Sequence, residues 1–179
     1  EFNKLDVDYY LTGCATGGDT LKAYGELLAN NPELKEEAEA FSKKVKDINE
    51  YLVDILQVDL TSMQGLYGRV TYHDPCHLNR GQGVSEQPRK LLKDLPGIEY
   101  VEMEAASDCC GAAGLFQGFY PEIAVPITDL KVNSIAKTGA DFVTTSCPAC
   151  LNRIEGSLNL AGCKPKALHI VDLLAMAYE

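Results

Sequence analysis

The stretch Asp141-Phe-Val-Thr-Thr-Ser-Cys-Pro-Ala-Cys150 decides the fold of this chain. Its first half, residues 141–145, is a short run of aromatic and β-branched residues, which predicts a strand. Pro148 follows directly, and proline suits the first turn of a helix, so a helix is predicted from about this position. A strand that passes directly into a helix is the repeating unit of a parallel α/β sheet.

The same alternation runs through residues 69–179. Short runs rich in β-branched and aromatic residues predict further strands at 69–73, 98–102 and 166–170. Apolar residues at helical spacing predict helices at 87–95, 121–138 and 171–178. We therefore expect an α/β fold with a parallel sheet of about four strands flanked by helices.

Five cysteines follow three of the predicted strands. Cys76 comes after the first strand, Cys109 and Cys110 after the second, and Cys147 and Cys150 after the third. The first gap, between 76 and 109, holds 32 residues, and the second, between 110 and 147, holds 36. Ligands of open parallel sheets bind beyond the carboxyl ends of the strands. We therefore expect the five cysteines to gather at the C-terminal ends of the strands.

Composition narrows the class of protein. Seven cysteines among 179 residues are an odd number, which excludes complete intramolecular pairing and favours metal or redox use. The formal net charge of −10 argues against a nucleic-acid partner, since no run of Lys and Arg could displace phosphate counterions. No apolar stretch approaches the roughly 18 residues of a transmembrane helix. We expect a cytoplasmic protein, or one associated with a membrane only through its partners.

The adjacent pair Cys109-Cys110 favours a multi-iron cluster over a single ion. Neighbouring side chains diverge, so both reach metal more easily when the metal atoms are separated. Five thiolates also exceed the four that a tetrahedral zinc site takes. Gly111 and Gly114 would let the chain bend and bring backbone amides near sulfur. Zinc in place of iron, buried structural cysteines and an opportunistic disulfide are the alternatives.

Several other residues are candidates for a role at the site. His73 and His77 flank the first cysteine and could donate to sulfur or replace a ligand, with His77 the better candidate, although a supporting or core role suits both. Cys163 is expected to be a loop thiol outside the site, and His169 a structural residue of its strand. Three aromatic residues near the cysteine pair are expected in the core or as a cover over the site: Phe116, Phe119 and Tyr120.

Residues before position 69 contain a partial copy of the opening stretch. Shifted by 133 positions, residues 8–17 match residues 141–150 in Asp, Thr and Cys, with Gly17 in place of the second cysteine. A strand at 7–11, a helix at 19–29 and a charged amphipathic stretch at 32–56 are predicted here, with no upstream partner for the strand. Chance similarity over ten residues is the alternative. Cys14 is not expected to hold a cluster, because its second ligand is lost.

The segments Asp74-Pro-Cys-His77, Cys109-Cys-Gly111 and Cys147-Pro-Ala-Cys150 together resemble the motif of the cysteine-rich CCG domain family. This family includes a subunit of heterodisulfide reductase and the iron–sulfur subunits of glycolate and lactate oxidation. The resemblance implies that residues 67–179 are a complete CCG domain. It also implies that residues 1–66 are the tail of a preceding, truncated CCG domain with a linking helix.

The resemblance further implies a cofactor and its ligands. The ligands would be Cys76, Cys109, Cys110, Cys147 and Cys150, holding a [4Fe-4S] cluster that is non-cubane in heterodisulfide reductase. Zinc is the alternative, because one domain binds zinc in some relatives. Exposed clusters oxidise, so aerobic preparation is expected to leave the site without its cluster.

The function implied is that of an electron-transfer subunit of an oxidoreductase complex. Its partner would be a flavoprotein dehydrogenase or another redox subunit, and the complex would oxidise a 2-hydroxy acid such as glycolate or lactate. One alternative is a heterodisulfide reductase-like catalytic subunit that reduces a disulfide at the cluster. Another is a zinc-binding interaction module. No nucleotide-binding glycine pattern follows any predicted strand, so flavin or nicotinamide is not expected on this chain.

Overall fold

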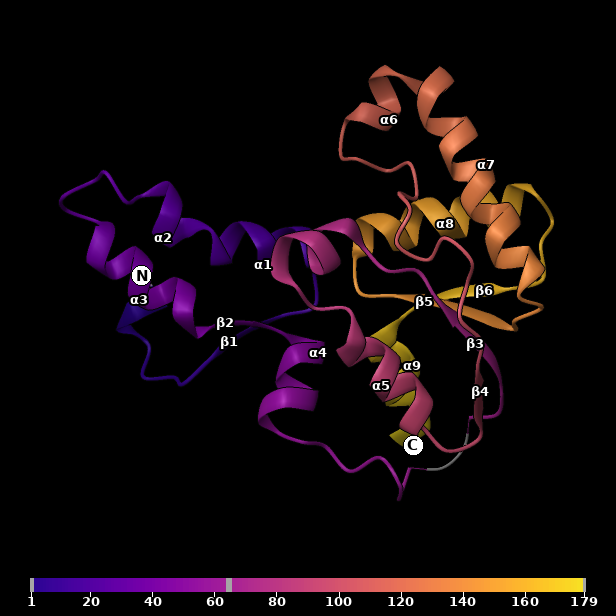
Figure 1. Cartoon of the computed structure of the whole chain (residues 1–179), viewed down its shortest axis with the longest axis horizontal. Helices are drawn as coiled ribbons and strands as arrows, with labels where there is room; N and C mark the ends of the chain where they lie inside the picture. Colours follow the sequence, from indigo (N-terminus) through magenta and orange to yellow (C-terminus); the bar gives the residue numbers. More distant parts are fainter. Residues whose placement is uncertain (1, 64–65, 179) are drawn as a thin grey trace.

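A four-stranded parallel sheet forms the centre of the larger lobe in the computed structural model, which describes residues 2–63 and 66–178 (Figure 1). The strands lie in the order β4 (Ile98–Tyr100), β3 (Gly68–Tyr72), β5 (Phe142–Thr145) and β6 (Lys166–His169). Every neighbouring pair is parallel. The predicted α/β fold is confirmed. Because the chain order reverses between β3 and β5, their carboxyl ends form the crevice in which such sheets bind ligands.

Helices cover both faces of this sheet. Helices α7 (Pro121–Lys137) and α8 (Pro148–Leu160) lie on one face, and α5 (Glu86–Asp94) and α9 (Ile170–Tyr178) lie on the other (Figure 1). Proline occupies the first turn of both α7 and α8, where a missing N–H costs nothing. The core on the α7–α8 face includes three of the cysteine side chains that follow the strands. The cysteines are therefore built into the packing of the sheet.

A smaller lobe is formed by the first part of the chain. Strand β1 (Tyr10–Thr12) pairs in parallel with β2 (Val45–Asp47). Around this pair lie the short helix η1 (Phe2–Lys4) and helices α1 (Ala15–Lys22), α2 (Tyr24–Leu27) and α3 (Lys35–Lys44). Helix α4 (Ile48–Glu50) and the π-helical η2 (Tyr51–Ile55) then lead into the larger lobe.

The sequence prediction was wrong in three places in the smaller lobe. The strand covers 10–12 rather than 7–11, and the helix predicted at 19–29 is two helices that meet at Ala23. The amphipathic stretch 32–56 is interrupted by β2, which supplies a downstream partner for β1. Local capping explains part of this difference. The Cys14 side chain accepts a hydrogen bond from Gly17 N and starts α1 early, and Asp47 starts α4 with a capping box.

The two lobes meet where β1 and β5 end. Ala15 N donates to Ser146 O at 3.1 Å, and His169 Nε2 lies 2.8 Å from Gly13 O. His169 was expected to be a structural residue, and its contact with Gly13 shows that it helps to join the two lobes. The sequence β1–α1–β2–α4 in the smaller lobe follows the same strand–helix–strand–helix order as β5–α8–β6–α9, with additional helices α2 and α3.

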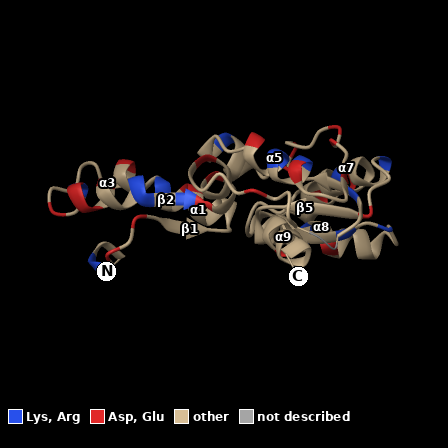
Figure 2. Ribbon diagram, turned by 90° about the horizontal axis from the view of Figure 1, so that it is seen from below, with Lys and Arg blue, Asp and Glu red and all other residues tan. Residues whose placement is uncertain are grey.

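Acidic and basic positions are interspersed over both lobes (Figure 2). Among the described residues, none of the helices combines the length and the apolar character that crossing a membrane requires.

Candidate metal centre

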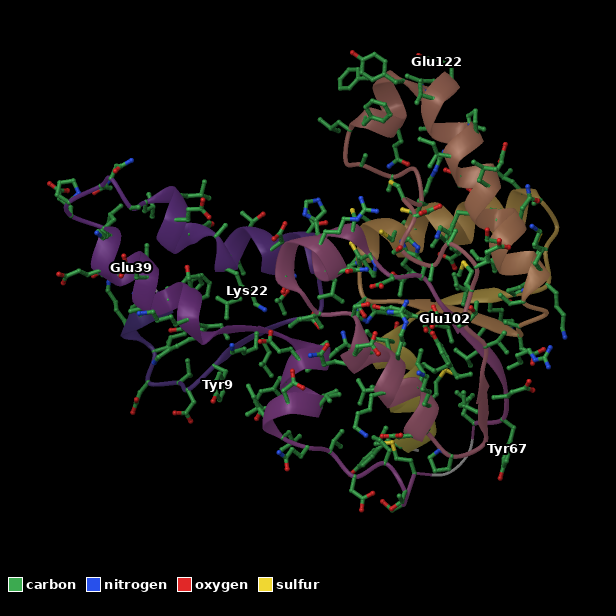
Figure 3. The ribbon with its side chains drawn as sticks, in the orientation of Figure 1. Tyr9, Lys22, Glu39, Tyr67, Glu102 and Glu122 are labelled. Carbon is green, nitrogen blue, oxygen red and sulfur yellow. The ribbon has the colours of Figure 1, made fainter. Side chains whose placement is uncertain are left out.

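The five predicted cysteines lie on three loops at one rim of the sheet. Cys76 starts the π-helical η3 (His77–Gly81) after β3, and Cys147 and Cys150 lie at the cap and in the first turn of α8 after β5. Cys109 and Cys110 lie in the loop between β4 and the short helix α6 (Phe116–Phe119). Sulfur atoms gather between this loop and the start of α8 (Figure 3). All five are free thiols.

The thiols contact one another in a chain. Cys110 Sγ and Cys150 Sγ lie within 4.8 Å of each other, and each lies within 4.8 Å of a ring nitrogen of His73. The thiols of Cys147 and Cys150, and those of Cys109 and Cys110, also lie close enough to shift each other's pKa. The structure therefore brings the two cysteines of the β4 loop together with the two of α8.

Burial of the cysteines differs across the rim. Cys110, Cys147 and Cys150 are 2%, 2% and 7% exposed, Cys76 is half-buried, and Cys109 is exposed. The centre is thus closed on the side of the core and open at Cys109.

Hydrogen bonding among the thiols favours thiolates at two of the four. The pKa of Cys147 is lowered to about 4 by the hydrogen bond from Cys150, with smaller contributions from backbone amides of α8 and the Thr16 hydroxyl. The hydrogen bond from Cys109 likewise lowers the pKa of Cys110. The donors Cys109 and Cys150 have raised pKa values for the same reason. Because thiolate is the form that binds metal, each pair favours one metal-binding thiolate before a metal binds.

Thr16 is a site residue that the sequence did not indicate. Its hydroxyl lies 3.7 Å from Cys147 Sγ, and it belongs to α1 of the smaller lobe. A contact between residues so far apart in the sequence leaves no local signal. The smaller lobe therefore contributes directly to the environment of Cys147.

His73, rather than His77, points into the centre. The His73 side chain is 1% exposed, and neither ring nitrogen has a hydrogen-bond partner among the described residues. A buried polar group without a partner costs about 1–3 kcal/mol. His77 instead places Nδ1 2.6 Å from Asp19 Oδ2 of the smaller lobe and is exposed. The preference for His77 over His73 was wrong. His73 follows the end of β3, where its ring turns toward the thiols, whereas His77 lies in η3, where its ring turns toward Asp19.

Gly111 has the conformation that the bend after the cysteine pair requires. Its φ is +84°, and an added Cβ would lie 2.3 Å from Thr128 Oγ1. Its N–H donates to Cys109 Sγ at 3.3 Å, as expected of an amide near sulfur. Thr128 Oγ1 also donates to Cys110 O at 2.9 Å. Helix α7 therefore holds the cysteine loop by direct contact with its backbone.

Lys131 is a second site residue that the sequence did not indicate. It is 2% exposed, and its Nζ donates to Ala105 O at 2.6 Å and to Ala106 O at 3.1 Å. Burial lowers its pKa, while the charges of Asp108 and Cys110 act in the opposite direction. A lysine on a helix is normally exposed, so its role as an anchor for the loop before the cysteine pair depends on tertiary packing.

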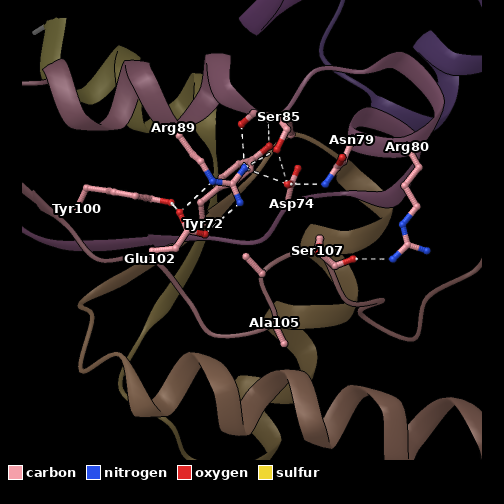
Figure 4. A network of polar contacts seen from close by, with 12 residues as sticks. Tyr72, Asp74, Asn79, Arg80, Ser85, Arg89, Tyr100, Glu102, Ala105 and Ser107 are labelled. Carbon is pink, nitrogen blue, oxygen red and sulfur yellow. Dashed lines mark hydrogen bonds and ion pairs between the residues drawn. The ribbon is translucent and has the colours of Figure 1, made fainter.

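A buried ionic network fixes the turn that carries Cys76 (Figure 4). Asp74 Oδ2 accepts hydrogen bonds from Asn79 Nδ2 and Ser85 Oγ at 2.8 Å and from Arg89 Nη1 at 2.9 Å. Arg89 also binds Glu102 with two hydrogen bonds, at 2.9 and 3.0 Å. The network joins the end of β3, helix α5 and the segment after β4. It therefore fixes two of the three cysteine loops relative to each other.

The remaining candidates lie outside the centre. Cys14 caps α1, and Cys163 packs against the core, as expected of a thiol without assigned chemistry. The interpretation as core was wrong for Phe119 and Tyr120, which are 72% and 50% exposed, and their interpretation as a cover over the site stays a prediction. Helix α6 itself projects from the larger lobe (Figure 1).

The donor set fits an iron–sulfur cluster. Five unpaired cysteines follow the strands at one rim, four of them close together, and an adjacent pair on a sharply bent loop suits separated metal atoms. Thiolates are favoured at two positions, and a backbone N–H already donates to sulfur. The unpartnered His73 adds a sixth donor beside the thiols.

Comparison with known proteins places this arrangement in a family. A family model described as a cysteine-rich domain, CCG, matches residues 70–155. Over 177 residues the chain is 42% identical to a fumarate reductase (CoM/CoB) subunit of Methanothermobacter marburgensis, covering 96% of this chain and 33% of that protein. It is 38% identical over 180 residues to a probable glycolate oxidase iron-sulfur subunit of Bacillus subtilis, covering 98% of this chain and 40% of that protein.

Lactate utilization protein A of a Geobacillus species is 33% identical over 168 residues, which cover 94% of this chain and 70% of that protein. The chain thus spans well under half the length of the first two relatives and more than two thirds of the third. The matched model includes all five cysteines of the rim. The chain therefore belongs to the cysteine-rich CCG domain family.

Proposed function

We propose that this chain is an iron–sulfur electron-transfer subunit of an oxidoreductase complex, with a [4Fe-4S] cluster held by Cys76, Cys109, Cys110, Cys147 and Cys150. The observation that carries the proposal is the meeting of these thiols at the crevice between β3 and β5. A relative named as an iron–sulfur subunit supports the same chemistry. When bound, the cluster supplies one-electron redox chemistry.

The protein's own residues would prepare the site and limit its access to water. Buried Cys110, Cys147 and Cys150 would hold the cluster against the core, and Gly111 N–H and the Thr16 hydroxyl would donate to sulfur. Cys109, being exposed, would face the partner. Such hydrogen bonds and burial are the means by which proteins set cluster potential.

We propose that the complex oxidises a 2-hydroxy acid such as glycolate or lactate, with electrons delivered by a flavoprotein dehydrogenase or another redox subunit. The support comes from the relatives named as a glycolate oxidase subunit and a lactate utilization protein. Copurification of the native complex with a flavoprotein, and reduction of the cluster by glycolate or lactate, would test it. Lack of reduction by either acid in the intact complex would contradict this substrate class.

The ligand set is tested by Cys110→Ser in protein reconstituted anaerobically with iron and sulfide. We expect bound iron to fall and visible absorption to weaken, because Cys110 lies close to both its neighbour Cys109 and Cys150. Cys163→Ser is the matched control, since this thiol follows the C-terminal end of α8, whereas Cys150 lies in the first turn of that helix. Unchanged iron in Cys110→Ser would contradict the ligand set. Stoichiometric zinc without iron after anaerobic preparation would instead favour a zinc-binding interaction module.

A second candidate function is reduction of a disulfide at the cluster. It is favoured by the exposure of Cys109 beside three buried thiols, which leaves the centre open to a sulfur substrate. Reduction of a thiol disulfide by the reconstituted protein alone, without a dehydrogenase partner, would support this candidate. Electron transfer to a partner without disulfide reduction would oppose it.

We also propose that residues 67–179 form a complete CCG domain and that residues 1–66 are the tail of a preceding one. Glu1, Gln64, Gly65 and Glu179 of these ranges lie outside the described residues. In support, β1 matches β5 in the repeat, and β5 lies between β3 and β6, whereas β1 has only β2 beside it among the described strands. Limited proteolysis should cut first at residues 54–57, which are exposed, because Leu60 and Leu66 further along the chain are buried in the core of the larger lobe. First cuts within β3 or α5 would contradict this boundary.

A further inference from the structure

Lys131 of α7 carries a positive charge into the core beside the cysteine pair. It is 2% exposed, and no other lysine or arginine among the described residues is buried. Lys131 and Cys109 line the same cavity, which has a volume of about 100 Å³. The negative charges of Cys110, Cys109 and Cys150 attract its ammonium group. We propose that Lys131 is a positioning residue whose buried positive charge raises the reduction potential of the cluster, an inference that rests on the proposed iron–sulfur function.

The backbone around Lys131 is arranged to hold an ammonium group. Its Nζ donates to Ala105 O at 2.6 Å and to Ala106 O at 3.1 Å. Ala105 has a φ of +59°, in the left-handed region that residues with a side chain seldom adopt. Ala106 O also accepts a hydrogen bond from Asp74 N at 3.1 Å, so the ammonium lies where the loop of Cys76 meets the loop of the cysteine pair. A buried charge requires such hydrogen-bond partners, because burial without them is costly.

The sign of the effect follows from the charges. Thiolate ligands make the site negative, and reduction by one electron adds one more negative charge. A fixed positive charge nearby therefore stabilises the reduced form more than the oxidised form and raises the potential, which depends on the net charge and burial of a cluster. Salt weakens this attraction only slightly, because buried charges are screened much less than exposed ones.

Two other charged groups near the cysteine loop act differently. Arg153 of α8 donates from Nε to Thr128 Oγ1 at 2.8 Å, but its side chain is only half-buried, so solvent screens its charge. Asp108 is an exposed carboxylate, and its negative charge would lower the potential. Lys131 is therefore the described residue whose charge is expected to raise the potential most.

The test compares two substitutions that remove the charge but differ in hydrogen bonding. Lys131→Met removes both the charge and the donor, whereas Lys131→Gln removes the charge and keeps an amide donor for the loop carbonyls. The full chain is reconstituted anaerobically with iron and sulfide, bound iron is counted, and redox titration with electron paramagnetic resonance gives the potential. We expect the ratio of reduced to oxidised cluster to fall about tenfold in both variants, which is about 59 mV for one electron.

Lys137→Met is the matched control, because Lys137 lies on the same helix and is exposed. This variant should leave the ratio within about twofold, since salt screens an exposed charge. An unchanged potential in both Lys131 variants, with iron retained, would overturn the proposal and leave Lys131 as an anchor of the loop. A shift in Lys131→Met that Lys131→Gln restores would also overturn it, because hydrogen bonding would then be responsible. If the unchanged chain binds no iron, the proposed function fails and this inference fails with it.

A measurement on the unchanged chain covers the case in which neither variant assembles a cluster. Acetylation of lysine amines, followed by mass spectrometry, compares Lys131 with Lys137 in the loaded and the metal-free chain. We expect loading to slow the acetylation of Lys131 several-fold and to leave that of Lys137 unchanged, because a nearby negative charge favours the ammonium form, which does not react. Equal rates for Lys131 in the two states would overturn the proposal.

Discussion

Asp74 is the buried anion of the network that holds the Cys76 turn, and its removal should destabilise the whole larger lobe. Its side chain is 1% exposed, and Oδ2 accepts hydrogen bonds from Asn79, Ser85 and Arg89. We predict that Asp74→Ala lowers the free energy of unfolding by about 3–5 kcal/mol, the cost of removing one partner of a buried ion pair. The lower end is expected, because Arg89 keeps its two hydrogen bonds to Glu102.

The measurement is urea unfolding of the reduced, metal-free chain, followed by far-ultraviolet circular dichroism. With a slope of about 2 kcal/mol per molar urea, the midpoint should fall by about 1.5–2.5 M. Asp94→Ala is the matched control, because this aspartate pairs with Lys90 on the exposed surface of α5 and its loss should cost only about 0.3–0.5 kcal/mol. A loss below about 1 kcal/mol in Asp74→Ala, at unchanged slope, would refute the reasoning.

Three further predictions follow from the contacts around the centre. Gly111→Ala should lower the free energy of unfolding by more than about 2 kcal/mol and lower bound iron, because its Cβ would collide with α7. Gly114→Ala, also at positive φ but in open space, should lower it by about 1 kcal/mol. Equal losses for the two variants in urea unfolding would contradict this reasoning. Thr16→Val should raise the pKa of Cys147, seen as slower alkylation of the metal-free chain at mildly acidic pH, and an unchanged profile would exclude the contact. Burial raises the pKa of Glu50, but its two lysine partners lower it by more, so the ionised carboxylate stabilises the fold above pH 4.5 and this stabilisation is lost as the pH falls further. Glu50→Gln should therefore make the free energy of unfolding fall less steeply with acid. An unchanged dependence on pH in acid unfolding would contradict this reasoning.

Most of the larger lobe could be predicted from local patterns. Its strands and helices begin within a few residues of the predicted positions, because Pro121 and Pro148 mark helix starts and β-branched runs mark the strands. The predicted places of the cysteines followed from these elements, since parallel strands end at one rim.

The smaller lobe could not be predicted to the same degree. Strands β1 and β2 have only three residues each, and such short strands depend on their pairing rather than on local preference. Val45 and Asp47 lie at the end of a charged helical stretch, and they form a strand because Tyr10 and Thr12 are beside them. Sequence periodicity does not record that neighbour.

The sequence by itself determined which cysteines follow which strands, and hence that five of them can meet at one edge of a parallel sheet. Only the tertiary structure decided what surrounds them. It turned His73 inward and His77 toward Asp19, buried Lys131 under the cysteine loop, and placed Thr16 against Cys147. The physical reason is that these contacts join residues on separate elements, so they depend on how the lobes and layers pack and not on the order of neighbouring residues.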